Sequence, residues 1–308
     1  MSDSAIHAVA GAAGGIVAMS ATYPLIFLST RAAVGAKNDN KSFYQILVDT
    51  IKREGLLGLY SGLDSSLLGI SVTNGVYYYF YERSRGIILK SRSGAKGLSA
   101  LESILAGLIA GSATTIISNP IWVVQTSQAV RTLESSGQPV ATRKLSFIQT
   151  LKNIVAKDGI QAFWRGIGPA LVLVINPVLQ YTVFEQLKNL LIASRTKKLR
   201  AAGAAASVVA ILSDWDFFFL GALSKLVATG STYPYIVIKS RLQAGQASAL
   251  KYKSTIDGLL TILKEEGIGG LYKGVGSKLV QSVLTAAILF AGQRRFYEIT
   301  KKVSSLLS

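Results

Sequence analysis

The chain has 308 residues, of which 50% are hydrophobic and 16% charged, and its formal net charge is +17. Soluble proteins carry about 25% charged residues, so this composition favours a membrane protein. The chain has no cysteine and one histidine, His7, which excludes disulfides, zinc–thiolate sites, iron–sulfur clusters and His-centred triads. Long uncharged runs separate the basic residues, so nucleic-acid binding is excluded as the main interpretation.

Six segments are long and apolar enough to be predicted as membrane-spanning helices, which places both termini on the same side. In chain order they are residues 4–30, 65–81, 103–130, 166–184, 217–238 and 279–293. The fifth contains one charge, Lys225. The alanine-rich residues 201–213 are too few to span a membrane, and we expect a loop there. The N-terminus has neither a basic region nor a cleavage-site pattern, so we expect no removed signal peptide.

A motif of one proline and two glycines occurs three times and predicts three structural repeats. Each long segment contains a proline near its end, namely Pro24, Pro120 and Pro234. An acid–glycine pair follows each proline, and a second glycine comes eight residues after the acid. The copies read Glu54-Gly55…Tyr60-Ser61-Gly62, Asp158-Gly159…Trp164-Arg165-Gly166 and Glu266-Gly267…Tyr272-Lys273-Gly274. We expect repeats over residues 1–97, 98–200 and 201–308 of one transmembrane domain.

Each proline and its glycine motif are separated by an amphipathic segment, at residues 43–53, 145–157 and 255–265. Apolar residues recur there with helical spacing, so each repeat is predicted to carry a short loop-side helix. The three prolines remove helical hydrogen bonds and predict kinks in the long helices. The alternative is that the prolines end those helices.

This triple motif resembles the mitochondrial carrier family over essentially the whole chain. The resemblance implies an all-α membrane protein with six transmembrane helices in three pseudo-symmetric repeats around a central cavity. It also implies solute exchange by alternating access, without enzymatic activity. The sequence itself contains no nucleophile–base pair or metal-ligand constellation, and we expect no metal and no cofactor.

The family closes one end of the cavity with charges in the pattern proline-x-acid-x-x-base-x-base, from which this chain departs. Ile26, Trp122 and Ile236 replace the acids, and Ser29, Gln125 and Lys239 occupy the first basic positions. We therefore expect a weak, largely apolar gate that includes Trp122 and Gln125. Burial of Lys239 without a carboxylate is costly, so we expect it to face an aqueous vestibule.

The opposite gate of the family follows the pattern aromatic-acid-x-x-base. Two copies are present, Tyr81-Glu82-x-x-Arg85 and Phe184-Glu185-x-x-Lys188, whereas the third aligns with Gln293-Arg294 and lacks the acid. We expect a partial ring of charges from these residues. The alternative is ordinary pairing along single helices, which stabilises a helix by a few tenths of a kcal/mol.

Three stretches resemble one branch of the family. Trp122 in the sequence Pro-Ile-Trp-Val-Val is similar to carriers of nucleotides and nucleotide-containing cofactors. Residues 221–235 and 278–287 are similar to peroxisomal adenine nucleotide carriers of fungi. The resemblance implies a multi-pass antiporter that exchanges ATP for AMP or ADP across the peroxisomal membrane. Alternatives are carriage of CoA, FAD or NAD, or a nucleotide carrier of the mitochondrial inner membrane.

Lys225 is a charge in the middle of the fifth span. It lies nine residues before Pro234, and the equivalent positions of the other repeats hold Gly15 and Gly111. A lysine at the centre of a membrane helix costs about 2.5–3.5 kcal/mol. We therefore predict that Lys225 contacts an anionic solute, although snorkelling to the interface is an alternative.

Other polar residues inside the apolar spans are predicted to contact the solute's phosphates, ribose or base. They are Asn74, Tyr78, Asn176, Gln180, Lys278, Gln281 and Thr285. The alternatives are hydrogen bonds to neighbouring helices for the neutral residues and snorkelling for Lys278.

The partners we expect are nucleotides or nucleotide-containing cofactors and membrane lipids, with the chain acting as a monomer. The basic residues of 195–200 flank a span and also resemble addresses read by peroxisomal import factors. A weak gate leaves open a leak or uncoupling protein, and a non-transporting membrane scaffold would leave Lys225 unexplained.

Overall fold

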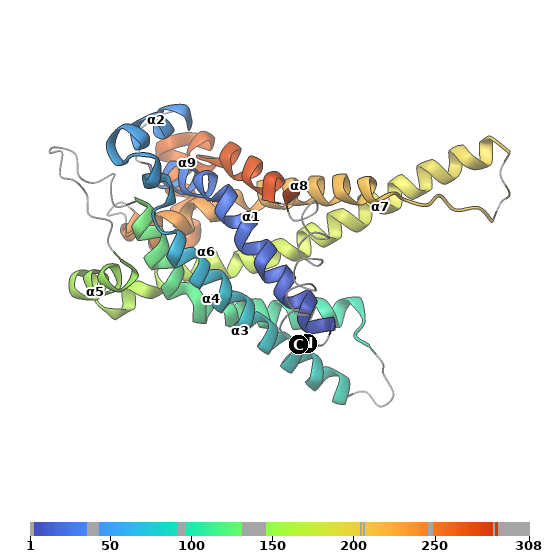
Figure 1. The fold of residues 1–308 in the computed structure, drawn as a ribbon, viewed down its shortest axis with the longest axis horizontal. Helices are drawn as coiled ribbons and strands as arrows, with labels where there is room; N and C mark the ends of the chain where they lie inside the picture. The colour runs from blue at the N-terminus through green and yellow to red at the C-terminus, as the bar shows by residue number, and fades with distance from the viewer. Residues whose placement is uncertain are drawn as a thin grey trace, which may run out of the picture. The chain divides into compact units, whose positions relative to one another are not determined.

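The structure is a computed structural model that describes residues 3–35, 43–91, 97–130, 146–203, 205, 207–245, 249–285 and 287–288. Every regular element in these ranges is a helix (Figure 1). The long helices are α1 (Asp3–Val34), α3 (Leu63–Lys90), α4 (Ala100–Val130), α7 (Asn176–Ala201) and α8 (Asp214–Gln243). Residues 275–285 are also helical. The predicted all-α class is confirmed.

Short helices occupy the three segments between the prolines and the glycine motifs. They are α2 (Phe43–Glu54), α5 (Phe147–Asp158) and α9 (Thr255–Leu271). The 3-10 turns η1 (Leu56–Tyr60) and η3 (Ile160–Trp164) follow α2 and α5, and η5 (Ala249–Lys251) precedes α9. The predicted loop-side helices are therefore present in all three repeats.

Local capping explains where two of these short helices begin. The Ser146 hydroxyl accepts a hydrogen bond from the Gln149 amide at 3.3 Å, and the Gln149 side chain accepts one from the Ser146 amide at 3.1 Å. Ser254 accepts from the Asp257 amide at 3.1 Å at the start of α9. Such bonds satisfy backbone donors that a helix leaves unpaired at its N-terminus.

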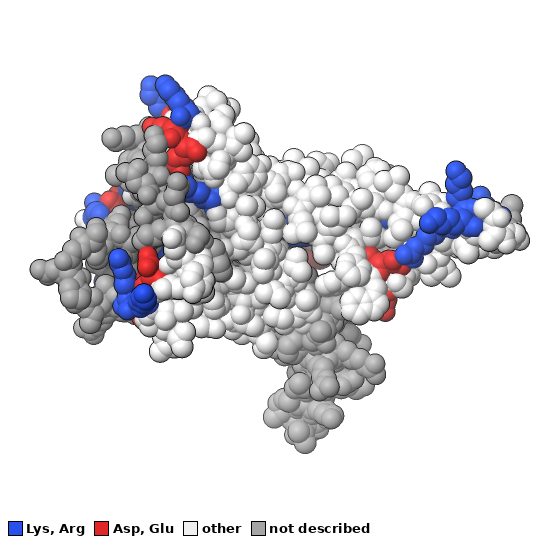
Figure 2. Space-filling model, turned by 90° about the horizontal axis from the view of Figure 1, so that it is seen from above, with Lys and Arg blue, Asp and Glu red and all other residues white. Residues whose placement is uncertain are grey.

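Four helical stretches of the described chain are long and apolar enough to cross a membrane: Gly15–Val34, Leu56–Lys90, Ala100–Val130 and Ile160–Ala201. The predicted fifth span lies in α8, where Lys225 and several hydroxyl residues lower the hydropathy. Of the predicted sixth span, residues 286 and 289–293 lie outside the described part of the chain. Figure 2 shows Lys and Arg side chains gathered towards the C-terminal end of α7, beside a largely uncharged helix surface.

The predicted fourth span is not one regular helix. It consists of α6 (Ile167–Val172), the 3-10 turn η4 (Leu173–Ile175) and α7, with Pro177 in the first turn of α7. Proline lacks a backbone donor, so it is tolerated at the start of a helix but not inside it. In contrast, α1, α4 and α8 continue past Pro24, Pro120 and Pro234. These three prolines therefore do not end their helices.

The chain forms two compact units. Unit 1 comprises Met1–Met19, Ile175–Thr232 and Leu279–Ser308, and unit 2 comprises Ser20–Val174 and Tyr233–Lys278. Unit 1 thus contains α7 and the first part of α8. Unit 2 contains the short loop-side helices with the C-terminal parts of α1 and α8 and the whole of α4.

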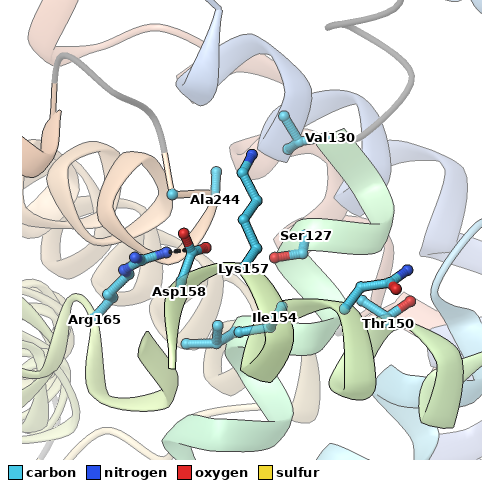
Figure 3. Close-up of a pocket in the computed structure, with 11 residues that line it drawn as sticks. Ser127, Val130, Thr150, Ile154, Lys157, Asp158, Arg165 and Ala244 are labelled. Atoms are coloured by element: carbon cyan, nitrogen blue, oxygen red, sulfur yellow. Dashed lines mark hydrogen bonds and ion pairs between the residues drawn. The ribbon is translucent and has the colours of Figure 1, made fainter. Parts of the chain in front are cut away.

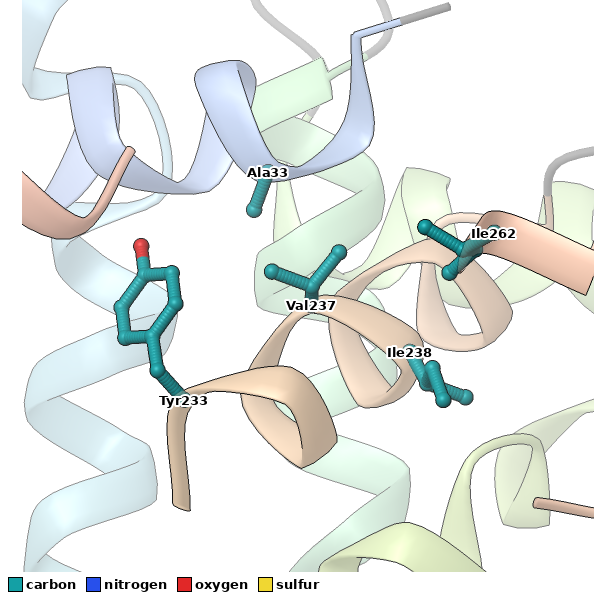
Figure 4. Packing of buried hydrophobic residues seen from close by; sticks show 5 residues of the cluster. All are labelled: Ala33, Tyr233, Val237, Ile238 and Ile262. Carbon is teal, nitrogen blue, oxygen red and sulfur yellow. The ribbon is translucent and has the colours of Figure 1, made fainter. Parts of the chain in front are cut away.

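The core of unit 2 repeats the same packing in two of the three repeats. One buried cluster comprises Ala33, Tyr233, Val237, Ile238 and Ile262, from α1, α8 and α9 (Figure 4). A second cluster uses the equivalent residues of the second repeat, Val123, Val124 and Ile154, with Ala162 and Phe163. In both cases the two residues three and four positions after the proline pack against the short helix. The core therefore holds each loop-side helix against the end of its long helix.

Candidate functional site

The residue before each proline donates a side-chain hydrogen bond to the glycine motif of its own repeat. These bonds join Tyr23 to the Ser61 carbonyl, Asn119 to the Arg165 carbonyl and Tyr233 to the Lys273 carbonyl, at 3.0, 3.2 and 3.0 Å. The three acceptors occupy the same position, immediately before the second glycine. This contact is the structural reason for a polar or hydroxyl-bearing residue before the proline.

The second glycine of each motif is required by its backbone conformation. Gly62, Gly166 and Gly274 have φ values of 87°, 73° and 81°, in the left-handed region that favours glycine. There is also little room for a side chain at these positions. A Cβ on Gly274 would lie 2.7 Å from the Ser29 carbonyl oxygen. The motif therefore marks a turn at which the chain passes close to a neighbouring helix.

Buried ion pairs join two of the long helices to their loop-side helices. Arg31 Nη1 lies 2.8 Å from Glu54 Oε1, and Arg241 Nη1 lies 2.5 Å from Glu266 Oε1. None of these four side chains is more than 9% exposed. Each pair uses the acid of the glycine motif and the last basic position of the proline motif. The sequence motifs contain the acid and the base of each pair, but the sequence did not predict that they form ion pairs.

The same two arginines also reach the neighbouring repeat. Arg31 Nε donates to the Ala129 carbonyl at 2.7 Å, and Arg241 Nε donates to the Ala33 carbonyl at 3.0 Å. Both acceptors lie nine residues after the proline of their own repeat. Each arginine thereby ties the end of one long helix to the end of the next.

The second repeat lacks this arginine, because Ser127 occupies its position. Its motif acid Asp158 pairs instead with Arg165 within the same motif, at 2.9 Å. The corresponding pair of the third repeat, Lys273 with Glu266 at 2.9 Å, exists beside the Arg241 pair. The three repeats therefore differ in how they are tied together at this end.

Neutral hydrogen bonds connect the predicted gate residues of unit 2. Gln125 Nε2 donates to Tyr23 Oη at 3.3 Å, and Trp122 Nε1 donates to Thr73 Oγ1 at 3.3 Å. The gate itself stays a prediction, and these bonds show that Gln125 and Trp122 have polar partners in unit 2.

Two residues that the sequence did not single out extend this network. Gln243 Nε2 donates to Asn119 Oδ1 at 3.0 Å and accepts from Thr126 at 3.3 Å. Amide and hydroxyl pairs thus connect positions near the ends of α4 and α8. Lys239 makes no hydrogen bond or ion pair with another described residue.

The charges of the opposite gate pair along single helices. Arg85 lies 3.3 Å from Glu82, and Lys188 lies 2.6 Å from Glu185, both with a spacing of three residues. Within unit 2, Tyr81 stacks on Tyr77 along α3. Within unit 1, Phe184 of α7 stacks on Phe217 of α8. Gln293 and Arg294 lie outside the described residues. A ring of charges between repeats stays a prediction.

Lys225 and Asn176 come together in unit 1. Lys225 Nζ lies 3.5 Å from Asn176 Oδ1. Asn176 Nδ2 donates to Thr232 Oγ1 at 2.7 Å and to the Ala228 carbonyl at 3.1 Å. Both amide hydrogens of Asn176 are thus used by α8, which turns its oxygen towards the ammonium. An ammonium has three donors, so Lys225 keeps donors beyond this contact.

The other residues predicted to contact the solute vary in their surroundings. Tyr78 on α3 is 69% exposed, and Asn74 is exposed on the same helix. Gln180 and Lys278 are partly buried. Gln281 donates to Thr285 at 2.9 Å along their own helical segment. In the described part of the chain, no group of three or more His, Cys, Asp and Glu residues could hold a metal ion.

An ion pair at the end of α7 was also missed. The two terminal guanidinium nitrogens of Arg195, Nη1 and Nη2, each donate to Asp216 at 2.6 Å, and Asp216 caps α8 by accepting from the Ser213 amide at 2.8 Å. Arg195 belongs to the basic cluster that the sequence suggested as a membrane flank or an address. The first residue of that cluster thus has a structural partner within unit 1.

Comparison with known proteins identifies relatives over the whole length. The family model described as mitochondrial carrier protein matches residues 2–92, 96–195 and 212–305. A peroxisomal nicotinamide adenine dinucleotide carrier of Arabidopsis thaliana is 36% identical over 100% of this chain and 98% of its own length. The peroxisomal membrane protein PMP47B of Candida boidinii is 32% identical over 94% of this chain and 84% of its own length. The peroxisomal adenine nucleotide transporter 1 of Saccharomyces cerevisiae is 29% identical over 97% of this chain and 92% of its own length.

Three consecutive family matches agree with the triple motif, the three loop-side helices and the all-helical structure. The chain therefore belongs to the mitochondrial carrier family: it is a membrane carrier of six helices in three repeats, not an enzyme.

Proposed function

We propose that this carrier is an antiporter of adenine nucleotides in the peroxisomal membrane, which exchanges ATP for AMP or ADP by alternating access. The observation that carries the proposal is the ammonium of Lys225 inside a membrane helix, held by the neutral Asn176. No described carboxylate lies within ion-pair distance of it. A positive charge inside a membrane helix is costly unless an anion pairs with it, and the phosphates of a nucleotide can be that anion.

The geometry of Asn176 supports a solute site at Lys225. Its two bonds to α8 fix the amide, so the ammonium has one defined neighbour and further donors for phosphate oxygens. A neutral anchor leaves the positive charge uncompensated until a solute arrives. The basic surplus of the chain would further concentrate polyanions near the cavity.

The remaining site residues are assigned to the neutral parts of the nucleotide. Tyr78 offers an exposed ring for stacking against a base. Asn74, Gln180, Gln281 and Thr285 offer amides and a hydroxyl for the base and ribose, and Lys278 offers a second cation. Alternating access requires gates at both ends of the path. The residues assigned to them are Trp122, Gln125 and Lys239 at one end and Tyr81, Glu82, Arg85, Phe184, Glu185 and Lys188 at the other.

NAD is the second candidate solute, because a relative named as a peroxisomal carrier of that dinucleotide is 36% identical over the whole chain. NAD and ATP share the adenosine phosphate part, so most of the assigned contacts serve either solute. The names of the three relatives also support the peroxisomal compartment.

Transport by the purified full-length protein in liposomes tests the solute. Liposomes are loaded with AMP, and uptake of labelled ATP is measured alone and with excess external NAD, CoA or FAD. The proposal predicts saturable ATP uptake that requires internal AMP. Uptake of labelled NAD in place of ATP would favour the second candidate. Uptake of ATP into liposomes without any internal solute would show that the protein is a leak pathway and not an antiporter.

The compartment is tested separately by imaging a tagged copy beside peroxisomal and mitochondrial markers. Overlap with the peroxisomal marker is expected. Overlap with the mitochondrial marker would overturn the compartment but not the exchange reaction.

A further inference from the structure

The end of the hairpin formed by α7 and α8 is a basic surface that the transport proposal does not use. Residues 195–216 contain four basic and two acidic side chains, and Figure 2 shows Lys and Arg gathered at this end of α7. The whole segment belongs to unit 1. None of its residues is assigned to the transported solute or to a gate, so its charge needs its own explanation.

Hydrogen bonds hold this end of the hairpin in a defined shape. The two terminal nitrogens of Arg195 each donate to Asp216 at 2.6 Å, which ties α7 to the first turn of α8. Between the two helices the chain returns beside α7, and the Ala210 amide donates to Thr196 Oγ1 at 3.0 Å. Thr196 and Ala210 are 8% and 7% exposed. The surface is therefore preformed and is not a free loop.

The cations of this surface are one paired and three unpaired groups. Arg195 is neutralised by Asp216. Lys197, Lys198 and Arg200 are exposed, and they make no ion pair with another described residue. With about 3.6 residues per turn, these three positions fall within half a turn of α7. They therefore form one positive face on the outside of the hairpin.

The arginines beside the glycine motifs are arranged differently. Arg165 Nη1 lies 2.9 Å from Asp158 Oδ2 in unit 2 (Figure 3). Arg31 and Arg241 likewise contact the acids of their own motifs, at 2.8 and 2.5 Å. Those charges are compensated within the protein. The three cations at the hairpin end are not, and such a positive face attracts anions from outside the protein.

The start of α8 indicates the depth of these cations relative to the membrane. The predicted fifth span begins at Phe217, next to the Asp216 that Arg195 binds. Lys197 and Arg200 lie two and five residues further along α7. At about 1.5 Å per residue, they are about 3 and 8 Å beyond that level. The polar headgroup region adds about 5–8 Å on each side of the hydrocarbon core, so the cations lie at the depth of the headgroups.

Apolar and aromatic side chains at the same end favour lipid as the partner. Trp215 and Phe219 are 63% and 64% exposed, and their ring centroids lie 6.2 Å apart. Exposed aromatic rings at a helix end are typical of the interface between a membrane and water. Ile211 is 92% exposed and follows Ala210, whose amide is bonded to α7. Cations beside exposed apolar residues are the combination with which proteins bind anionic membrane surfaces.

We propose that this end of the hairpin binds the headgroups of anionic phospholipids in the membrane that α8 enters. Lys197, Lys198 and Arg200 supply the positive charge, and Ile211 supplies an apolar contact with the same lipids. The surface is separate from Lys225. It does not depend on which solute is transported or on how the gates work.

Fluorescence energy transfer in liposomes tests this surface. The chain has no cysteine, so the full-length Ser207→Cys variant, changed at an exposed position of the same loop, carries a single donor dye. The liposomes are phosphatidylcholine with a trace of acceptor lipid labelled on its acyl chain, either phosphatidylserine or phosphatidylcholine. We expect at least about twofold more transfer to phosphatidylserine, and equal transfer in about 1 M salt, which screens exposed charges. Equal transfer to both lipids at low salt would overturn the proposal.

A charge variant in the same labelled background localises the effect. Replacing the three cations together, as Lys197→Gln, Lys198→Gln and Arg200→Gln, should make the two transfer values equal. The matched control replaces three exposed cations of the loop-side helices by glutamine and should keep the preference. They are Lys52, Arg53 and Lys264. Unfolding midpoints in a neutral detergent check that both variants fold. A preference that survives the first variant, or that is lost in both, would overturn the assignment.

The apolar contact has its own variant. Ile211→Asn should lower transfer to both acceptor lipids, because an apolar contact does not distinguish their headgroups. Unchanged transfer would remove Ile211 from the surface. An acidic protein segment is the other partner that such charges could bind. No such segment is present in the liposomes, so a surface built for one would show no preference between the two lipids.

Discussion

The side-chain oxygen of Asn176 lies 3.5 Å from the ammonium nitrogen of Lys225, and the amide of Asn176 is bonded to the same helix as that lysine. Asn176 thus acts as a neutral support that orients a charge without cancelling it. The Asn176 amide donates to the Ala228 carbonyl and to Thr232, which lie one and two helical turns after Lys225.

Changing Asn176→Ala should weaken nucleotide uptake about tenfold, because a hydrogen bond to a charged group contributes about 1.5–3 kcal/mol and the 3.5 Å contact is a long one, at the lower end of that range. The effect should appear mainly in KM, since the ammonium remains but loses its orientation. Thr232→Val removes only one of the two bonds that fix the amide and should give a smaller rise in KM. Initial rates in liposomes over a range of external ATP measure both. Unchanged KM in Asn176→Ala would remove this residue from the site.

Arg241→Ala should strongly destabilise the protein. Removing one partner of a buried pair leaves an uncompensated charge and costs about 3–5 kcal/mol. Arg165→Ala is the matched comparison, because the Arg165–Asp158 pair is 20% and 27% exposed and exposed pairs contribute about 0–1 kcal/mol. Thermal unfolding in detergent should rank the two variants in this order. Equal midpoints would show that burial does not set the strength of these pairs.

The stability of unit 2 should fall in acid because of Glu266. Burial raises the pKa of this carboxyl, but hydrogen bonds from Arg241 and Lys273 outweigh it and hold the pKa below its ordinary value. A carboxyl with a lowered folded pKa stabilises the fold above its unfolded pKa, about 4.3, and this contribution is lost as the pH falls through the folded pKa.

Unfolding midpoints measured from pH 7 down to pH 3 test this dependence. The wild type should lose stability below about pH 4.3, and Glu266→Gln should be less stable at pH 7 but flatter with pH. An identical acid slope in both proteins would show that other carboxyls carry the effect.

Ser127→Arg should give the second repeat the tie that the first and third repeats possess. Glu266 already accepts both Arg241 and Lys273, so Asp158 has a precedent for accepting a second cation beside Arg165. The expected gain is up to about 1 kcal/mol, because Asp158 is partly exposed. An unfolding midpoint below that of the wild type would contradict the equivalence of the three positions.

The sequence predicted the parts of the fold that local chemistry determines. The recurring acid, aromatic and glycine positions revealed three repeats, because each glycine must adopt a left-handed conformation that other residues rarely adopt. Helical periodicity located the three short helices for the same local reason. The 3-10 turn before α7 was missed although Pro177 signalled it.

The contacts between repeats could not be read in this way. Gln125 meets Tyr23 across 102 positions, and Gln243 meets Asn119 across 124 positions. A single sequence shows that these side chains are polar but not which of them meet. Lys225 was different, because a charged residue inside an apolar span can be recognised from the sequence even when its partner is not known. Its contact with Asn176 depended on the turn before α7 and was not predicted.

The central claim is that Lys225 binds the transported anion, and one measurement tests it most directly. Uptake of labelled ATP into AMP-loaded liposomes is compared for the wild type, Lys225→Ala and the control Lys152→Ala, after equal insertion has been checked. We expect uptake by the wild type and the control and none above empty liposomes for Lys225→Ala. Full exchange by Lys225→Ala would contradict the account.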